Sequence, residues 1–331
     1  QRCDILLISY GGLSREREGH MKEFVLIPDT ACDLCKEQRG QLGIPDYLHG
    51  IFYENDGTER LIDLDEPREN INAFFDSMGK MKTLYRTATP TVGEAVHVFE
   101  KYAQKGIDVI SLSLSSGLSA TYSVTLGAAK QVMEKYPQAK IYCVDSLCYS
   151  GGIAALLCGA SKRQKEGKSA EEVVAYLESA RTHLHQCGCM DDLFFLNKTG
   201  RVSNAKAFFG SMIGLKLMAD FNERGMVEVM GKTKGKRAML DAAIAYIKKT
   251  IVNPAEQTIV MTQSAREDVT NELAERIRME IGPKDIMFVP LGRACGASIG
   301  PGLCVAMYFG TERTAGCVRE KEILSEILSA K

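Results

Sequence analysis

Short apolar runs alternate with longer helical patterns between residues 24 and 180, and few folds accommodate such an order. The apolar runs predict buried strands at Phe24–Pro28, Ile107–Ser113 and Ala139–Asp145. The segments that follow predict helices over about Val92–Gly106, Ala120–Lys135 and Gly151–Gln164. Capping boxes mark two helix starts, at Thr91-x-x-Glu94 and Ser169-x-x-Glu172. The alternation predicts a parallel sheet with helices on both of its faces.

The second half of the chain is less regular. Strand patterns occur at Thr258–Thr262, Asp285–Leu291 and Leu303–Phe309, with a helical pattern over about Arg266–Ile281. We therefore expect two domains: a three-layer α/β/α domain with a parallel sheet over residues 21–175, and an α+β domain with a mixed sheet over 176–331. The boundary is soft, between about residues 164 and 184, and exchange of a strand between the domains stays open.

Residues 1–20 fit nothing that follows them. Gly19-His20-Met21 is typical of a cloning scar before an initiator Met, so we expect this segment to be derived from cloning and exclude it from the fold. The next residues run into a strand, which predicts a cytoplasmic protein.

The charge balance narrows the function classes. The 331 residues include 41 basic and 42 acidic side chains, and this near-neutral balance gives no basic surplus for nucleic acid. The apolar runs all fall short of the roughly 20 residues that a membrane helix needs. The eleven cysteines, in a chain of this size, are typical of small buried residues in a reducing compartment.

Several motifs have ordinary structural explanations. Cys32-x-x-Cys35 resembles a redox pair, but its flanks favour a loop. His183, His185, Cys187 and Cys189 alternate in a way that favours a strand, because four ligands along one strand cannot all reach one zinc ion. Gly225–Thr233 almost matches a phosphate-binding loop, yet it has one residue too many between its glycines and favours a hairpin.

A cluster of hydroxyls follows the predicted strand at Ile107–Ser113. Its members are Ser115, Ser116, Ser119 and Thr121, with Gly117 allowing a tight turn. The carboxyl end of a parallel strand, facing the N-terminus of the next helix, is a place where an open α/β sheet binds anions. Capping that helix would need only one hydroxyl, so the cluster predicts an oxyanion site.

A second hydroxyl cluster, Thr87-Ala-Thr89-Pro-Thr91, precedes another predicted helix. The two clusters could converge on one carboxylate or phosphate, because each neutral hydroxyl bonded to a charged partner contributes roughly 1.5–3 kcal/mol. The alternative is a hydrolase or transferase with a serine nucleophile. That class needs a nearby base, and the chain has only five histidines, none of which the sequence brings to the serines.

These two clusters resemble motifs of the DegV family of fatty-acid-binding proteins. The first looks like the family's S-S-G-L-S-G-T-Y motif and the second like its T-S-Q-P-S loop. Five further segments resemble family motifs in the same order: Pro28–Leu34, Val144–Leu157, Leu196–Ser203, Lys232–Gly235 and Gly296–Gly302. The resemblance runs from about Phe24 to Phe309.

The resemblance implies a long-chain fatty acid buried between two domains and presented to a partner fatty-acid kinase, without catalysis or a cofactor of the protein's own. Thr87, Ser119 and Ser298 would bind the ligand carboxylate. Arg201 and Lys234 would contact an anion or the partner. Ser298 stands where the family motif has a His, which makes phosphorylation of the bound acid by a partner a separate question. We expect apolar walls from Phe194–Asn197 and Ala207–Met218.

Overall fold

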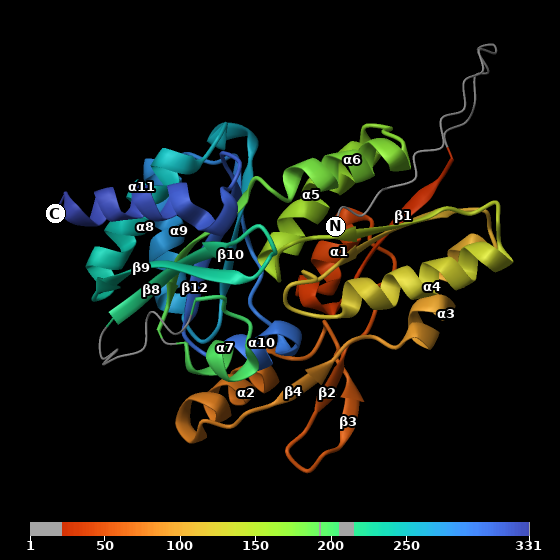
Figure 1. The fold of residues 1–331 in the computed structure, drawn as a ribbon, viewed down its shortest axis with the longest axis horizontal. Helices are drawn as coiled ribbons and strands as arrows, with labels where there is room; N and C mark the ends of the chain where they lie inside the picture. The colour runs from red at the N-terminus through yellow and green to blue at the C-terminus, as the bar shows by residue number, and fades with distance from the viewer. Residues whose placement is uncertain (1–21, 192, 205–214, 331) are drawn as a thin grey trace.

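The computed structural model describes residues 22–191, 193–204 and 215–330 (Figure 1). The segment expected to derive from cloning lies outside the described residues. The predicted boundary between residues 175 and 176 falls inside α6 (Ala170–Ala180), and the division into domains stays a prediction.

The first lobe is the predicted three-layer arrangement. Its parallel sheet has the order β1-β5-β6, made of Phe24–Pro28, Asp108–Ser113 and Ile141–Asp145. The helices α3 (Val92–Ala103) and α4 (Thr121–Lys135) cover one face. The other face packs against α5 (Gly151–Lys165) and α6, with η1 (Thr30–Cys32) and α1 (Lys36–Leu42) beside them. The three predicted strands are confirmed, with β6 beginning two residues later than expected.

A small antiparallel sheet lies below this lobe in Figure 1. It has the order β3-β2-β4, made of Glu59–Leu61, Ile51–Tyr53 and Arg86–Ala88, and α2 (Arg68–Met81) packs beside it. The sequence did not predict this sheet, because strands of three residues are too short to show a periodic pattern. Thr87 therefore lies on a strand, where the sequence placed a loop.

The second lobe is built on a six-stranded mixed sheet. Its order is β11-β10-β12-β7-β8-β9, made of Asp285–Phe288, Thr258–Gln263, Leu303–Phe309, Leu184–Met190, Leu215–Phe221 and Val227–Lys234. Only the β10–β11 pair is parallel. One face is covered by α8 (Lys236–Thr250), α9 (Glu267–Glu280) and α11 (Val318–Ser329). The remaining short elements are α7 (Phe194–Thr199), α10 (Arg293–Ile299), η3 (Pro254–Glu256) and η4 (Ala315–Cys317).

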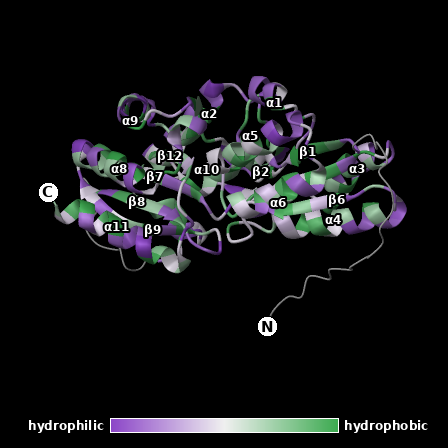
Figure 2. Cartoon of the chain, turned by 90° about the horizontal axis from the view of Figure 1, so that it is seen from above, coloured by the Kyte–Doolittle hydropathy of each residue, from purple (hydrophilic) through white to green (hydrophobic). Residues whose placement is uncertain are grey.

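Helix α5 lies between the lobes and packs against strands of both (Figure 2). Its first residue explains how closely it approaches the second sheet: a Cβ on Gly151 would lie 2.2 Å from the Oγ1 atom of Thr262. A glycine at this helix start therefore brings the lobes together, and the core beside α5 is continuous between them.

One of the two predicted capping boxes is confirmed. Ser169 and Glu172 bond reciprocally at the start of α6. Thr91 caps α3 by accepting from the N–H of Glu94, but the Glu94 carboxylate instead accepts from the N–H of His49, at 2.7 Å, and contacts its ring. Glu94 thus connects α3 to the preceding chain. The predicted box at Thr91 and Glu94 was therefore wrong, because the Glu94 side chain does not bond back to the N–H of Thr91.

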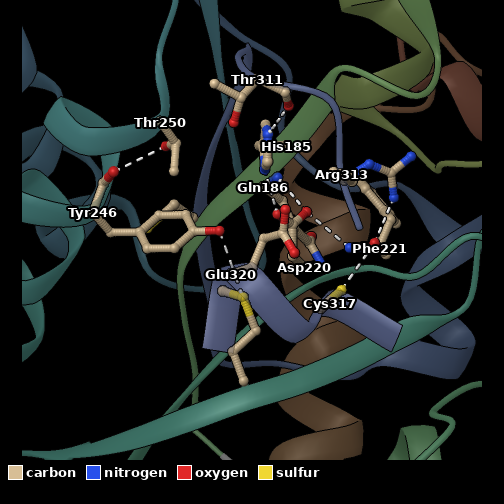
Figure 3. A network of polar contacts seen from close by, with 12 residues as sticks. His185, Gln186, Asp220, Phe221, Tyr246, Thr250, Thr311, Arg313, Cys317 and Glu320 are labelled. Carbon is tan, nitrogen blue, oxygen red and sulfur yellow. Dashed lines mark hydrogen bonds and ion pairs between the residues drawn. The ribbon is translucent and has the colours of Figure 1, made fainter. Parts of the chain in front are cut away.

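Three of the four alternating residues, His185, Cys187 and Cys189, lie on β7, as the strand interpretation predicted, whereas His183 lies in the turn before it. In Figure 3 the ring of His185 lies between the carboxylate of Asp220, at 2.6 Å, and the carbonyl oxygen of Thr311, at 2.7 Å. Among the described residues no group of three or more His, Cys, Asp and Glu side chains is placed to hold a metal ion. The predicted hairpin is β8–β9.

Two other function classes, a redox site at Cys32 and a membrane-spanning protein, were considered from the sequence. Burial raises the pKa of the Cys32 thiol, opposite to the shift that a reactive thiolate needs. Every helix within the described residues is too short or too polar to cross a bilayer.

Candidate functional site

A cavity of about 370 Å³ lies where the carboxyl ends of β1 and β5 meet β4, α7 and α10. Its volume falls in the range of roughly 300–1,000 Å³ that is usual for small-molecule sites. The predicted hydroxyl residues that line it are Thr87, Thr89, Ser119, Thr121 and Ser298. These residues come from β4 and the segment after it, from the start of α4, and from α10. The fold thus brings three segments that are far apart in the sequence to the lining of one cavity.

The hydroxyls at the start of α4 are already connected to one another. The Oγ atom of Ser119 lies 2.9 Å from the Oγ1 atom of Thr121, and it accepts from the Thr121 N–H at 3.3 Å. Helix α4 begins at Thr121 with no side-chain cap on Ala120. The Thr121 N–H is thus bonded to Ser119, and the next N–H groups of the first turn have no partner within the helix, a feature that favours anion binding at a helix start.

The other members of this cluster lie outside the cavity lining. The Ser115 hydroxyl donates to the carbonyl oxygen of Gly225 at 2.8 Å, and the Ser116 N–H donates to the Asp145 carboxylate at 3.0 Å. A Cβ on Gly117 would lie 2.2 Å from the carbonyl oxygen of Arg224. Gly117 is thus needed for close approach to the β8–β9 turn. These three residues shape the loop that carries Ser119.

The two predicted cationic residues are placed differently. Arg201 lines the cavity, and its guanidinium donates to the carbonyl oxygens of Leu118, at 3.3 Å, and Thr199. Those carbonyls are neutral, so the Arg201 charge remains available to an anion. Lys234 is exposed at the end of β9 and does not line the cavity.

Asp29 was not singled out as a site residue from the sequence. It does cap η1, by accepting from the N–H of Ala31 at 2.7 Å, but it also lines the cavity and accepts from the N–H of Leu114 at 2.8 Å. Burial raises its pKa to about 6, against the opposing effect of those two N–H groups. Its place at the carboxyl end of β1, beside β5 in a parallel sheet, is the signal that could have identified it.

The rest of the wall is largely apolar. Its apolar and weakly polar members are Ala31, Ile62, Ala88, Pro90, Leu114, Leu118, Ala120, Tyr149, Leu196, Val227, Ala294, Cys295 and Ile299. Leu196 belongs to Phe194–Asn197, one of the two segments that the sequence predicted to form apolar walls. Of the other predicted segment, Ala207–Met218, residues 207–214 lie outside the described residues and 215–218 begin β8. Tyr149, Ile62 and Val227 were not predicted, because nothing local separates them from core residues.

Two buried polar contacts hold this wall in place. The guanidinium of Arg293, the first residue of α10, makes two hydrogen bonds of 2.7 Å to the Glu66 carboxylate and so fixes the helix that carries Ser298. The Tyr149 hydroxyl donates to the side-chain oxygen of Gln186 at 2.6 Å. The N–H of Gln186 in turn donates to Asp220 within the network of Figure 3.

Comparisons with known proteins agree on one family. The family model that matches, for uncharacterised proteins of the DegV family, covers residues 23–310. The DegV domain-containing protein CPE0026 of Clostridium perfringens is 32% identical over 290 residues, which are 88% of this chain and 98% of the relative.

Solved structures with the same fold include two ligand-bound proteins. A DegV family protein of Eubacterium eligens, loaded with heptadecanoic acid, has a TM-score of 0.75 at 20% identity, covering 87% of this chain and 100% of its own. The fatty acid kinase (Fak) B3 protein of Streptococcus pneumoniae, loaded with linoleic acid, has a TM-score of 0.73 at 21% identity, covering 87% and 99%. With the family model matched along most of its length and a curated relative 32% identical, this chain belongs to the DegV family.

Proposed function

We propose that this protein binds a long-chain fatty acid in the 370 Å³ cavity, with the carboxylate on the hydroxyls of Thr87, Ser119 and Ser298. The observation that carries the proposal is that hydroxyls from three distant segments line one cavity whose other lining residues are largely apolar. Thr89 and Thr121 line the same cavity and would add donors. Neutral donors hold a carboxylate without the cost of burying a matching cation.

The apolar walls supply the affinity. Burial contributes about 0.8 kcal/mol for each methylene, so a chain of about 16 carbons gains more than ten kcal/mol before the costs of binding. Related structures carry ligands of this class: the Eubacterium eligens protein holds heptadecanoic acid and the Streptococcus pneumoniae protein holds linoleic acid.

The protein would act as a carrier that presents its fatty acid to a partner kinase. The Streptococcus pneumoniae relative is named as a fatty acid kinase component, which supports this role. Arg201 would contact the bound head group, because the partners of its guanidinium among the described residues are neutral carbonyl oxygens. The exposed Lys234 would contact the partner. Ser298, in place of the family's His, offers a neutral donor, so lipid binding and phosphorylation should be measured separately.

A serine-nucleophile hydrolase or transferase finds less support. Among the described residues that line the cavity there is no histidine, and the Ser119 hydroxyl lies against that of Thr121. Asp29 is the one carboxyl group among the described lining residues, and the two N–H groups that it accepts from oppose its protonation and so weaken it as a base.

The direct test is mass spectrometry of a solvent extract of the purified protein. We expect fatty acids in near-stoichiometric amount, and the delipidated protein should bind dodecanoate in solution. An empty extract together with no binding of dodecanoate would refute the proposal. Release of free acid from an ester substrate, abolished by Ser119→Ala, would instead support the hydrolase.

A further inference from the structure

The cavity has two charged side chains among its described lining residues, and one of them is an acid. Arg201 is the cation and Asp29 the anion. Asp29 is only 3% exposed, so its charge is little screened by solvent. A carboxylate ligand would place a second negative charge in the cavity that already contains this one.

Asp29 lies between the two hydroxyl segments. Its Oδ2 atom accepts from Leu114, which begins the loop that carries Ser119. The next residue, Thr30, accepts from the N–H of Gly50, and a Cβ on Gly50 would lie 3.2 Å from the carbonyl oxygen of Ala88, the neighbour of Thr87. Asp29 therefore bonds directly to the loop that carries Ser119, and its neighbour Thr30 bonds to Gly50, which lies beside the strand that carries Thr87.

The described lining includes one cation, Arg201, which could offset only one of two carboxylate charges. The titratable groups that interact with it are Asp33 and Cys32 in and after η1, Cys148 after β6, and Cys295 on α10. Burial raises the pKa of each of the three thiols, which leaves them neutral near pH 7. Burial also raises the pKa of the Asp33 carboxyl, to about 7. The cavity lining also includes Arg201 and the buried Tyr149, whose pKa is raised well above its usual value by burial.

We propose that Asp29 takes up one proton from solvent when a fatty-acid carboxylate binds, so that the two carboxyl groups share a single negative charge. Two carboxylates in one buried site cannot both stay ionised at low cost, and such pairs retain a proton. The one bond that forms is the O–H bond of the Asp29 carboxyl, whose proton comes from bulk water and returns there when the ligand leaves. The inference rests on the proposed function, since it places the ligand head group in the cavity that Asp29 lines.

The sign of the pH dependence follows from the direction of proton transfer. Binding consumes a proton, so the affinity for a carboxylate falls as the pH rises. Free Asp29 already carries its proton well below its pKa of about 6, so the dependence begins above that pH. We expect the affinity to fall by up to about tenfold per pH unit between about pH 6.5 and 8.

The test is isothermal titration calorimetry of delipidated protein with dodecanoate, in two buffers that differ in ionisation enthalpy, at pH 7. We expect close to one proton taken up per dodecanoate bound, and close to none for dodecanol, which has the same chain and a neutral head group. This comparison uses the unaltered protein, so it remains decisive if a variant fails to fold.

Two variants identify the group that is protonated. Asp29→Asn should abolish proton uptake and flatten the pH profile for dodecanoate. The matched control is Asp33→Asn, which removes a neighbouring buried carboxyl that does not line the cavity and should leave the uptake in place. Binding of dodecanoate without proton uptake, or uptake lost in Asp33→Asn but kept in Asp29→Asn, would overturn the inference and leave the proposed function intact. Failure of dodecanoate to bind at all would overturn the proposed function.

Discussion

The salt bridge between Glu66 and Arg293 should determine how firmly α10 is held against the cavity. Its two hydrogen bonds measure 2.7 Å, and the side chains are 8% and 10% exposed. The Arg293 guanidinium also lies 4.8 Å from the ring centres of Phe52 and Phe74. Glu66→Gln removes the countercharge while keeping the shape, so Arg293 is left as a buried charge. Breaking such a pair costs about 3 kcal/mol of unfolding free energy.

Urea unfolding followed by circular dichroism at 222 nm measures this loss, because the chain has no Trp to report by fluorescence. The matched control is Asp76→Asn on α2, which breaks a pair with Lys80 whose side chains are 63% and 76% exposed. We expect that control to change the unfolding free energy by less than about 0.5 kcal/mol. Equal effects of the two substitutions would refute the claim that this salt bridge anchors α10.

The pH dependence gives a second check on the same pair. Burial on its own would raise the pKa of Glu66, but the hydrogen bonds and charges of Arg293 and Arg60 hold it below its usual value of 4.5. A lowered pKa in the folded state means that the stabilisation is fully present above pH 4.5 and is lost as the pH falls through the lowered value. The stability difference between the unaltered protein and Glu66→Gln should therefore shrink below about pH 4.5 and stay constant from pH 6 to 8.

Two further substitutions test the cavity wall. Ser119→Ala combined with Thr87→Ala should weaken dodecanoate binding by at least about 100-fold, since each lost hydrogen bond to a charged group costs roughly 1.5–3 kcal/mol. Ser116→Ala, in the same loop but exposed and outside the cavity lining, should leave binding unchanged, and an equal effect of the two would contradict the site. Tyr149→Phe leaves the buried Gln186 oxygen without its 2.6 Å donor, so unfolding should become easier by about 1–3 kcal/mol in the same urea experiment. An unchanged midpoint there would mean that this oxygen has found another partner.

Local sequence pattern predicted the first lobe well. The strands β1, β5 and β6 and the helices between them each carry their own periodicity, and Ser169 marks the start of α6 by a box of four residues. Glu94 shows the limit of such signals. Its spacing from Thr91 fits a capping box, yet its carboxylate bonds to His49, a partner 45 positions away in the sequence.

The hydroxyl clusters were also visible in the sequence, because hydroxyls beyond those needed for capping are unusual at a helix start. The sequence could not show which of these hydroxyls line the cavity and which bond elsewhere in the protein. Ser115 and Ser119 look alike in the sequence, but Ser115 bonds to the β8–β9 turn while Ser119 lines the cavity. The difference arises from the carbonyl of Gly225, which lies 110 positions away.

The sequence alone was sufficient to predict the strands β1, β5 and β6 and the helices α3 to α6, and to suggest an uncharged anion site, since these depend on residues that are neighbours along the chain. The cavity, the placement of Asp29 in its wall and the anchoring of Ser298 through Glu66 and Arg293 depended on the tertiary structure. These features exist only where segments separated by tens to hundreds of residues pack together, and side-chain burial, which sets the cost of each charge there, is a property of that packing.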